Sequence, residues 1–226
     1  METLRIISDV HGKIQQYIKL ASEVDYSIQL GDLGFAKEYK QLSRLNPDNH
    51  KVLGGNHDDY TWEDGEFVNQ TPHFLPDFGT HWLKFRHPIF FVRGGYSIDW
   101  KYRTPGVDWF PHEEISYSLL QRAIDHYGSS KWGCPNIVVS HECPASLIPH
   151  FATLTYFDGE LIRPSRTAYA LDAMLSLHRP KLWLFGHHHK DVDLTIDGTR
   201  FICRRELGHV DFLLEDGKLK LTALSS

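Results

Sequence analysis

Five short apolar runs in this sequence each lead into Asp, Asn or His, and this pattern constrains the fold more than any other feature. The runs, with the polar residues that follow, are Leu4–Ser8 before Asp9 and His11, Tyr26–Leu30 before Asp32, Lys51–Leu53 before Asn56 and His57, Ile137–Ser140 before His141, and Leu182–Phe185 before His187 and His189. Apolar runs of this length are typical of buried strands. Between them, residues such as Ile115, Leu119 and Ala123 repeat at helical spacing. Alternating strands and helices predict a parallel or mixed sheet, which binds ligands at the carboxyl ends of its strands.

Two of the motifs are too specific to arise by chance. From the composition, Gly-Asn-His-Asp, found at 55–58, is expected on the order of 0.002 times, and Gly-His-x-His, found at 186–189, roughly 0.07 times. Asp-x-His is expected about once, and Asp48–His50 is a second match beside Asp9–His11. The first two motifs therefore carry the interpretation.

The donor types in these motifs indicate metal binding. Carboxylate, amide and imidazole donors without Cys favour Mn, Fe, Zn, Co or Ni over Ca or a thiolate-bound structural Zn. In an extended segment, His187 and His189 lie on one side and His188 on the other, so we assign no metal to His188. Three glycines beside these ligands are expected at sharp turns with backbone angles that other residues resist: Gly31, Gly55 and Gly186.

The remaining apolar segments predict hairpins. His81–Arg93 and Asp191–Leu224 are rich in Val, Ile, Phe and Leu and are broken by turn residues, so we expect antiparallel hairpins that form a second sheet. A helix is expected to begin near His112. The sequence shows no internal repeat, low-complexity tract or long linker, which predicts a single domain over residues 1–226.

Composition excludes several classes of protein. The 226 residues include 24 Lys and Arg against 29 Asp and Glu, a net charge of −5, which argues against extended nucleic-acid binding. Three cysteines without a C-x-x-C pair suit a reducing compartment. The first apolar run is too short for a signal peptide, and no window approaches the ~18 apolar residues of a membrane span. We therefore expect a cytoplasmic protein without a membrane partner.

In this order, the five blocks resemble the calcineurin-like metallophosphoesterase superfamily, in particular its small bacterial and phage members. The resemblance spans residues 9–189. It implies an α/β fold, a four-layer α-β-β-α sandwich of two mixed sheets flanked by helices. It also implies two divalent metal ions (Mn, Fe, Zn, Ni or Co, with Mn expected in vitro). One ion would be held by Asp9, His11, Asp32 and His189, and the other by Asp32, Asn56, His141 and His187, with Asp32 as the bridge.

The resemblance further implies a metallophosphoesterase, a hydrolase that acts on ester bonds as a phosphodiesterase or phosphatase. A hydroxide that bridges the two metals would attack phosphorus, and His57 would protonate the leaving oxygen as general acid. Asp58 would fix the orientation of His57. The net negative charge of the protein disfavours binding along the phosphate backbone of a nucleic acid. We therefore expect a small phosphodiester or phosphomonoester as substrate.

Two segments without clear periodicity, 93–111 and 147–166, are candidate specificity elements. Non-periodic loops of this length usually have a function, here as a substrate lid or as a partner surface. Tyr96 and Arg103 in the first segment and Arg163 in the second are candidate substrate contacts, because Arg suits bidentate phosphate binding.

Two other functions remain alternatives. A nuclease that resembles the repair nucleases of the superfamily would need a basic groove near the metals and would bind DNA or RNA with strong salt dependence. A non-catalytic scaffold, like the retromer subunit that shares this fold, would lack ligands or the general acid. All the expected metal ligands and the general acid are present in this sequence. This disfavours the scaffold, because burial of polar ligands without a partner costs free energy.

Overall fold

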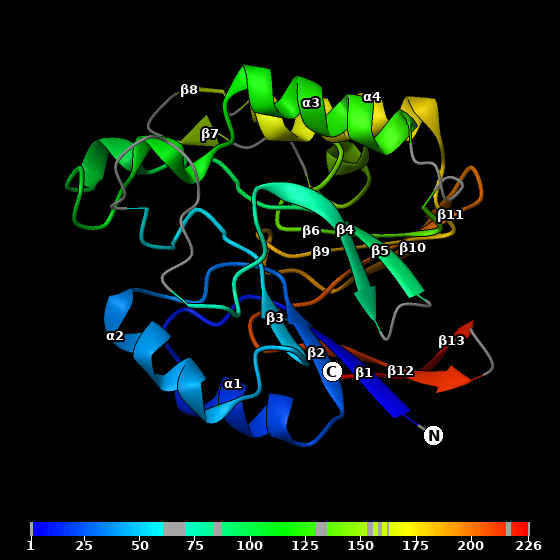
Figure 1. The fold of residues 1–226 in the computed structure, drawn as a ribbon. Helices are drawn as coiled ribbons and strands as arrows, with labels where there is room; N and C mark the ends of the chain where they lie inside the picture. Colours follow the sequence, from blue (N-terminus) through cyan, green and yellow to red (C-terminus); the bar gives the residue numbers. More distant parts are fainter. Residues whose placement is uncertain are drawn as a thin grey trace.

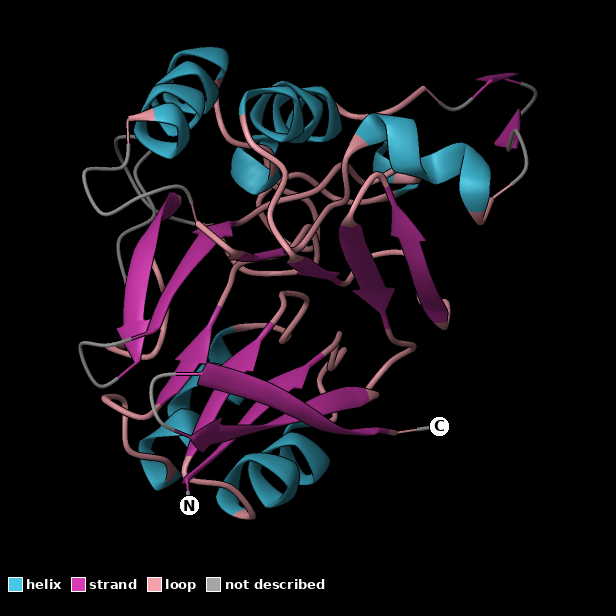
Figure 2. Ribbon diagram, turned by 90° about the vertical axis from the view of Figure 1, so that its right-hand side faces the viewer, coloured by secondary structure: helices cyan, strands magenta, loops and turns pink. Residues whose placement is uncertain are grey.

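Two β-sheets pack face to face, and helices cover the outer face of each (Figures 1 and 2). The computed structural model of the protein describes residues 2–60, 71–83, 87–129, 135–152, 156–157, 160–161, 163–215 and 218–225. This four-layer arrangement confirms the predicted α/β sandwich of two mixed sheets. Within the described residues, no helix is both long and apolar enough to span a membrane.

The first sheet has five strands in the order β13-β12-β1-β2-β3. Its strands are β1 (Glu2–Ile7), β2 (Tyr26–Gln29), β3 (His50–Val52), β12 (His209–Glu215) and β13 (Lys218–Leu224). β1, β2 and β3 are parallel, whereas β12 and β13 are antiparallel additions at one edge. The helices α1 (Ile14–Ser22) and α2 (Ala36–Tyr39) cover the outer face, as Figure 1 shows.

The second sheet has six strands in the order β10-β11-β9-β6-β5-β4. Its strands are β4 (Phe78–Leu83), β5 (His87–Val92), β6 (Ile137–Ser140), β9 (Leu182–Phe185), β10 (Val192–Ile196) and β11 (Thr199–Cys203). The helices α3 (Tyr117–Gly128) and α4 (Arg166–Leu177) lie on its outer face. Each helix begins after a serine, Ser116 or Ser165, whose hydroxyl accepts a hydrogen bond from a backbone N–H of the first turn.

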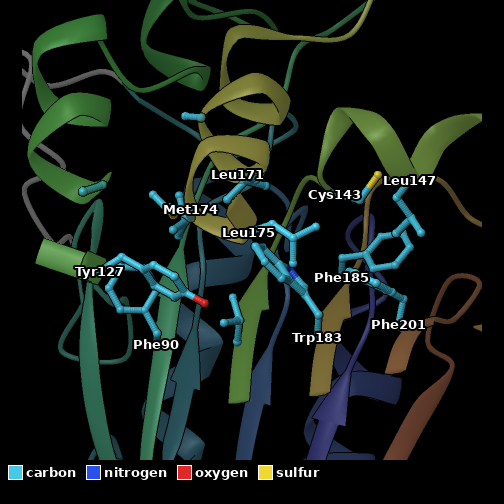
Figure 3. Packing of buried hydrophobic residues seen from close by; sticks show 14 of the residues in the cluster. Phe90, Tyr127, Cys143, Leu147, Leu171, Met174, Leu175, Trp183, Phe185 and Phe201 are labelled. Carbon is cyan, nitrogen blue, oxygen red and sulfur yellow. The ribbon is translucent and has the colours of Figure 1, made fainter. Parts of the chain in front are cut away.

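Alternating side chains divide each central strand between two cores. On β6, Val138 packs under α3 and α4, while Val139 faces the other sheet; Trp183 and Leu184 divide in the same way on β9. Figure 3 shows the outer core, in which Trp183 lies below α4. Strands that are buried on both faces read as continuous apolar runs, which is why these runs were visible in the sequence.

The predicted hairpins form, but they do not all join one sheet. β4 with β5 and β10 with β11 belong to the second sheet, whereas β12 and β13 complete the first sheet beside β1. The expectation of a single second sheet was therefore wrong for residues 209–224. Apolar alternation indicates a hairpin, but it does not say which sheet edge the hairpin joins.

The helix expected near His112 begins later in the chain. Residues Pro111–Glu113 form a single 3₁₀ turn, and α3 begins at Tyr117. The cap provided by Ser116 sets the start of α3, because its side chain accepts a hydrogen bond from Leu119 N.

An ion pair ties the C-terminal hairpin to the first sheet. Arg5 on β1 donates through Nε and Nη2 to the two oxygens of Asp211, which lies directly opposite on β12, at 2.7 and 2.8 Å. Arg5 is 8% exposed. A buried bidentate pair holds strand register more strongly than an exposed one, because removal of one partner leaves the other charge buried.

We predict that Asp211→Asn lowers the free energy of unfolding by about 2 kcal/mol, since the Arg5 guanidinium loses its bidentate partner and keeps only the single ion pair with Glu23 at 2.8 Å. Asp193 makes a matched bidentate pair with Arg200 across β10 and β11 at the surface, so Asp193→Asn is the control and costs less than about 1 kcal/mol. Urea denaturation measures both values. Equal losses in the two variants would contradict the role assigned to Asp211.

Candidate metal centre

The carboxyl ends of five strands bring all the predicted ligands to one place between the sheets. Their donor atoms form two groups, each with its atoms within 4.8 Å of one another. The first group is Asp9, His11, Asp32 and His189; the second is Asp32, His141 and His187. Asp32 belongs to both groups, as the resemblance implied for the bridging carboxylate.

The first group joins two imidazoles and two carboxylates. The Nε2 atoms of His11 and His189 lie 2.8 Å apart. His11 Nε2 is 3.6 Å from Asp32 Oδ2, and His189 Nε2 is 3.7 Å from Asp9 Oδ1. Four donor atoms thus converge on one small volume.

The second group forms around the amide oxygen of Asn56. Asn56 Oδ1 lies 2.9 Å from His141 Nε2 and 2.8 Å from His187 Nδ1. His141 Nε2 is also 3.3 Å from Asp32 Oδ1. The two oxygens of Asp32 therefore face different groups, which is the geometry of a shared carboxylate.

The hydrogen bonds around the second group fit a cation. His141 Nδ1 lies 2.8 Å from Leu30 O, which can only accept, so the ring proton is on Nδ1 and Nε2 carries a lone pair. The Asn56 amide donates through Nδ2 to Ser97 Oγ, so its Oδ1 faces His141. Two acceptors 2.9 Å apart repel each other, and a divalent cation that both coordinate removes this repulsion.

The charges of the site fit cations as well. Asp9 and Asp32 are 0% and 1% exposed, and burial together with the charge of Asp9 raises the pKa of Asp32. For Asp9, burial acts in the same direction, but the contact with His189 and the hydrogen bond from the Ser8 hydroxyl oppose it, and the pKa is lowered. Buried carboxylates in proteins are paired or coordinate metals.

Four of the ligands have an unusual backbone conformation. Among the described residues, six that are not glycine have a positive φ, and four of the six are His11, Asp32, His187 and His189, at 46°, 58°, 67° and 50°. Such angles cost of order 1–3 kcal/mol each and are retained where function requires them. The backbone thus turns sharply at the ligands themselves.

Only one of the three glycines behaves as the sequence predicted. Gly31 has a φ of 108°, but neither Gly55 nor Gly186 has a positive φ. Gly55 is required because a Cβ there would overlap the Asp32 carboxylate, and a Cβ on Gly186 would lie 2.9 Å from Asp9 Oδ2. For these two positions the expectation of unusual backbone angles was wrong, and close packing against the ligands is the reason for glycine.

His57 lies beside the first group. Its backbone N–H donates to Asp32 Oδ1 at 2.8 Å, and its ring centroid is 5.0 Å from that of His11. The guanidinium of Arg103 lies against the ring, with Nη1 and Nη2 each 2.9 Å from a ring nitrogen. Burial and then the charge of Arg103 lower the pKa of His57 to about 3.

Asp58 does not orient the His57 ring, which corrects the role expected from the sequence. Its fully buried carboxylate accepts hydrogen bonds from the backbone N–H groups of Asp32, Leu33, Gly34 and Gly55 at 2.7–3.1 Å, and from the hydroxyl of Tyr39 at 3.2 Å. Asp58 therefore holds the loop that carries Asp32, while the ring of His57 contacts Arg103.

Sequence reasoning missed a buried chain that fixes Asn56. Ser97 Oγ accepts from Asn56 Nδ2 at 3.0 Å and donates to Glu113 Oε2 at 2.7 Å, and Ser97 N donates to Glu113 Oε1. Glu113 is 2% exposed. Neither residue belongs to a motif, so nothing in the local sequence signals this chain.

A second missed residue, Glu142, supports His187. Its Oε2 is 3.7 Å from His187 Nε2, and it accepts from Ser165 Oγ at 3.1 Å. His188, to which we assigned no metal, is absent from these two ligand groups but lies in a third cluster of possible donors with Glu142 and Cys143; its Nε2 lies 2.9 Å from Glu142 Oε1. A carboxylate behind a metal-binding histidine is a common support, and its position directly after His141 was the only available signal.

The two candidate specificity segments meet beside this site. Tyr96 and Arg163 line a common cavity of ≈ 490 Å³, and the rings of Tyr102 and Phe157 are in contact, with centroids 6.0 Å apart. Arg103 lies instead on His57. Within segment 147–166, residues 153–155, 158–159 and 162 lie outside the described residues.

A four-layer sandwich with carboxylate and imidazole clusters at its strand ends defines the class of metal-dependent phosphoesterases. The sequence matches the family model described as calcineurin-like phosphoesterase over residues 3–191, so this chain belongs to that family. The two ligand groups lie within the matched residues. None of the curated proteins matches the sequence significantly.

Solved structures show the same fold at low sequence identity. Phosphopantetheinyl hydrolase from Mycobacterium tuberculosis is 16% identical, with a TM-score of 0.51 over 90% of this chain and 89% of that one. A putative 5′-nucleotidase from Staphylococcus aureus is 12% identical, with a TM-score of 0.51 over 99% of this chain and 53% of that one. The Plasmodium protein GAP50, an anchor in the inner membrane complex, is 12% identical, with a TM-score of 0.50 over 100% and 89%. At these identities the likeness shows the fold alone.

The Glu113 carboxyl generates a pH prediction, because burial raises its pKa from 4.5 to about 7. Between these values the unfolded chain releases a proton that the folded protein retains, so stability falls as pH rises. Relative to Glu113→Gln, the wild type loses about 3 kcal/mol of unfolding free energy by pH 8. Denaturant titrations from pH 4.5 to 8 measure this, with the exposed Asp125→Asn as control. Parallel curves for wild type and Glu113→Gln would contradict the prediction.

Proposed function

We propose that this protein hydrolyses small phosphoesters with two divalent cations, one in each ligand group. The observation that carries the proposal is the pair of groups that share Asp32, with His57 beside them. Asp9, His11, Asp32 and His189 would hold one ion, and Asp32, Asn56, His141 and His187 the other. When bound, such ions polarise phosphoryl oxygens and lower the pKa of water toward ~7. Donors of this type suit Mn, Fe, Zn, Ni or Co.

His57 is the proposed general acid. The hydrogen bond from its backbone N–H to Asp32 holds it at the edge of the first group, and its ring is not in either ligand group. With a pKa near 3, the ring is neutral in the protein alone. A phosphate group that pairs with Arg103 offsets the positive charge next to the ring, which favours the protonated form of His57 that would donate to the leaving oxygen.

Arg103 is the proposed phosphate contact. A neutral imidazole has one acceptor nitrogen, so only one of the two 2.9 Å contacts with His57 is a hydrogen bond. Asp99 holds the guanidinium from the other side, with Oδ1 2.8 Å from Nη2. Arg103 Nη1 also donates to Asp108 O at 3.3 Å, so the N–H that His57 cannot accept is the donor left for a phosphoryl oxygen, beside a ring that lies 5.0 Å from that of His11.

We predict that His57→Ala retains both metals but loses about 10²–10⁴-fold in kcat on an ester with a poor leaving group, because that leaving oxygen needs a proton. Asp32→Asn loses metal as well as activity. Metal-stripped protein is reloaded with Mn, Ni, Zn, Co or Mg, metal content is measured by mass spectrometry, and the exposed His112→Ala is the control. Unchanged turnover of the poor-leaving-group ester by His57→Ala would remove His57 from this role.

The preference for a small substrate has its own test. With a net charge of −5, the protein should bind an oligonucleotide weakly and with little dependence on salt. Binding of a labelled 20-nucleotide single strand is measured by anisotropy at low and moderate salt, with a nucleotide as the small-substrate control. Tight binding that falls steeply with salt, together with cleavage, would favour the nuclease.

A further inference from the structure

The cavity of ≈ 490 Å³ between the two specificity segments has no role in the chemistry described so far. One wall comes from residues 96–101, and the facing wall from Phe157, Leu161 and residues 163–166. Tyr117, at the start of α3, also lines it, and Phe157 and Leu161 come from a small antiparallel hairpin of β7 (Tyr156–Phe157) and β8 (Glu160–Leu161). Its volume suits a small organic ligand.

Two residues that line the cavity, Tyr96 and Ser165, are linked to the surroundings of the second ligand group. Tyr96 directly follows Gly95, where an added Cβ would lie 3.0 Å from the His141 ring and 3.3 Å from His187 Nδ1. On the other wall, Ser165 donates to Glu142, which supports His187. The organic part of a phosphoester bound at the ligand groups would extend along these residues toward the cavity.

The walls present apolar surface that is otherwise rare on this protein. In the part of the chain that the structure describes, nine large apolar side chains are exposed, and four of them line the cavity: Ile98, Trp100, Tyr117 and Leu161. Tyr117 is 74% exposed. Such a concentration of exposed apolar side chains marks a binding site, and its aromatic members suit a planar ring.

The two arginines of the cavity differ in their contacts. Arg166 is held in place, because it donates to the backbone oxygens of Glu114 and Ile115 and its guanidinium lies 5.3 Å from the centre of the Tyr117 ring. Arg163 is exposed, and none of the described acidic residues pairs with it. The cavity therefore combines a fixed aromatic wall with a cation that can bind a further anion.

We propose that this cavity binds the organic part of the substrate, a planar aromatic group that carries a second anionic group, as in a nucleoside phosphoester with an additional phosphate. The inference rests on the proposed function and names its substrate class. Tyr117 packs against the planar group, and Arg163 pairs with the second anion. Both are specificity residues and take no part in bond cleavage.

Three chromogenic esters with the same reacting bond test the proposal: methyl p-nitrophenyl phosphate, thymidine 5′-(p-nitrophenyl phosphate), and the latter with a 3′-phosphate. We expect kcat/KM to rise about tenfold from the first to the second, as one aromatic contact allows, and again with the 3′-phosphate. Tyr117→Ala abolishes the first increase and Arg163→Ala the second, and neither changes hydrolysis of the methyl ester. Tyr169→Ala and Arg122→Ala, exposed residues outside the cavity, are the matched controls.

The possible outcomes test substrate binding in the cavity separately from hydrolysis of the ester. Equal kcat/KM for the three esters, or equal effects of Tyr117→Ala on all of them, would overturn the cavity proposal and leave the phosphoesterase in place. If no metal restores hydrolysis of these diesters or of the monoester p-nitrophenyl phosphate, the proposed function fails, and calorimetric titration with thymidine 3′,5′-bisphosphate then tests the cavity by itself. The cavity proposal is supported if the bisphosphate binds, if Tyr117→Ala weakens this binding about tenfold and if Tyr169→Ala leaves it unchanged. Absence of binding overturns the cavity proposal.

Discussion

The structure depends on the burial of two carboxylates, Asp9 and Asp32, at the ends of adjacent parallel strands. Each costs desolvation energy, and their mutual repulsion adds to it. The fold offsets this cost with histidines that converge on both and with N–H donors, such as His187 N to Asp9 and His57 N to Asp32. The glycines around them leave the space that the carboxylates need. Buried carboxylates and imidazoles that converge in this way favour cations, in agreement with the family to which the chain belongs.

Residues behind the ligands connect the metal centre to the specificity segments. Asn56 is fixed through Ser97 and Glu113, and His187 is supported by Glu142, which Ser165 contacts. The segment 93–113 thus both orients a ligand and forms a wall of the cavity. Substitutions in the cavity walls that displace Ser97 or Ser165 are therefore expected to displace the metal-ligand side chains as well. Substitutions of Tyr117 or Arg163 are not expected to do so. This distinction separates binding of the substrate from cleavage of its ester.

The same fold occurs in a hydrolase and in an anchor protein, so the sandwich alone does not determine the function. What distinguishes this chain is its own site: two ligand groups that share a carboxylate, a histidine outside both groups, and an arginine against that histidine. Family membership and these groups together support a metal-dependent phosphoesterase. In the proposed function, the two specificity segments select the substrate, because binding residues are often placed on loops that a rigid scaffold positions.

The sequence by itself determined the strands, the layered α/β class and the residues that meet at the strand ends, because buried parallel strands read as apolar runs and their carboxyl ends share one edge. Tertiary structure alone decided the rest. Asp58 bonds to backbone groups of a loop far from it in sequence, Glu113 reaches Asn56 through Ser97, and β12 and β13 join the first sheet. These depend on contacts between segments distant in the chain, for which local periodicity and motif spacing contain no information.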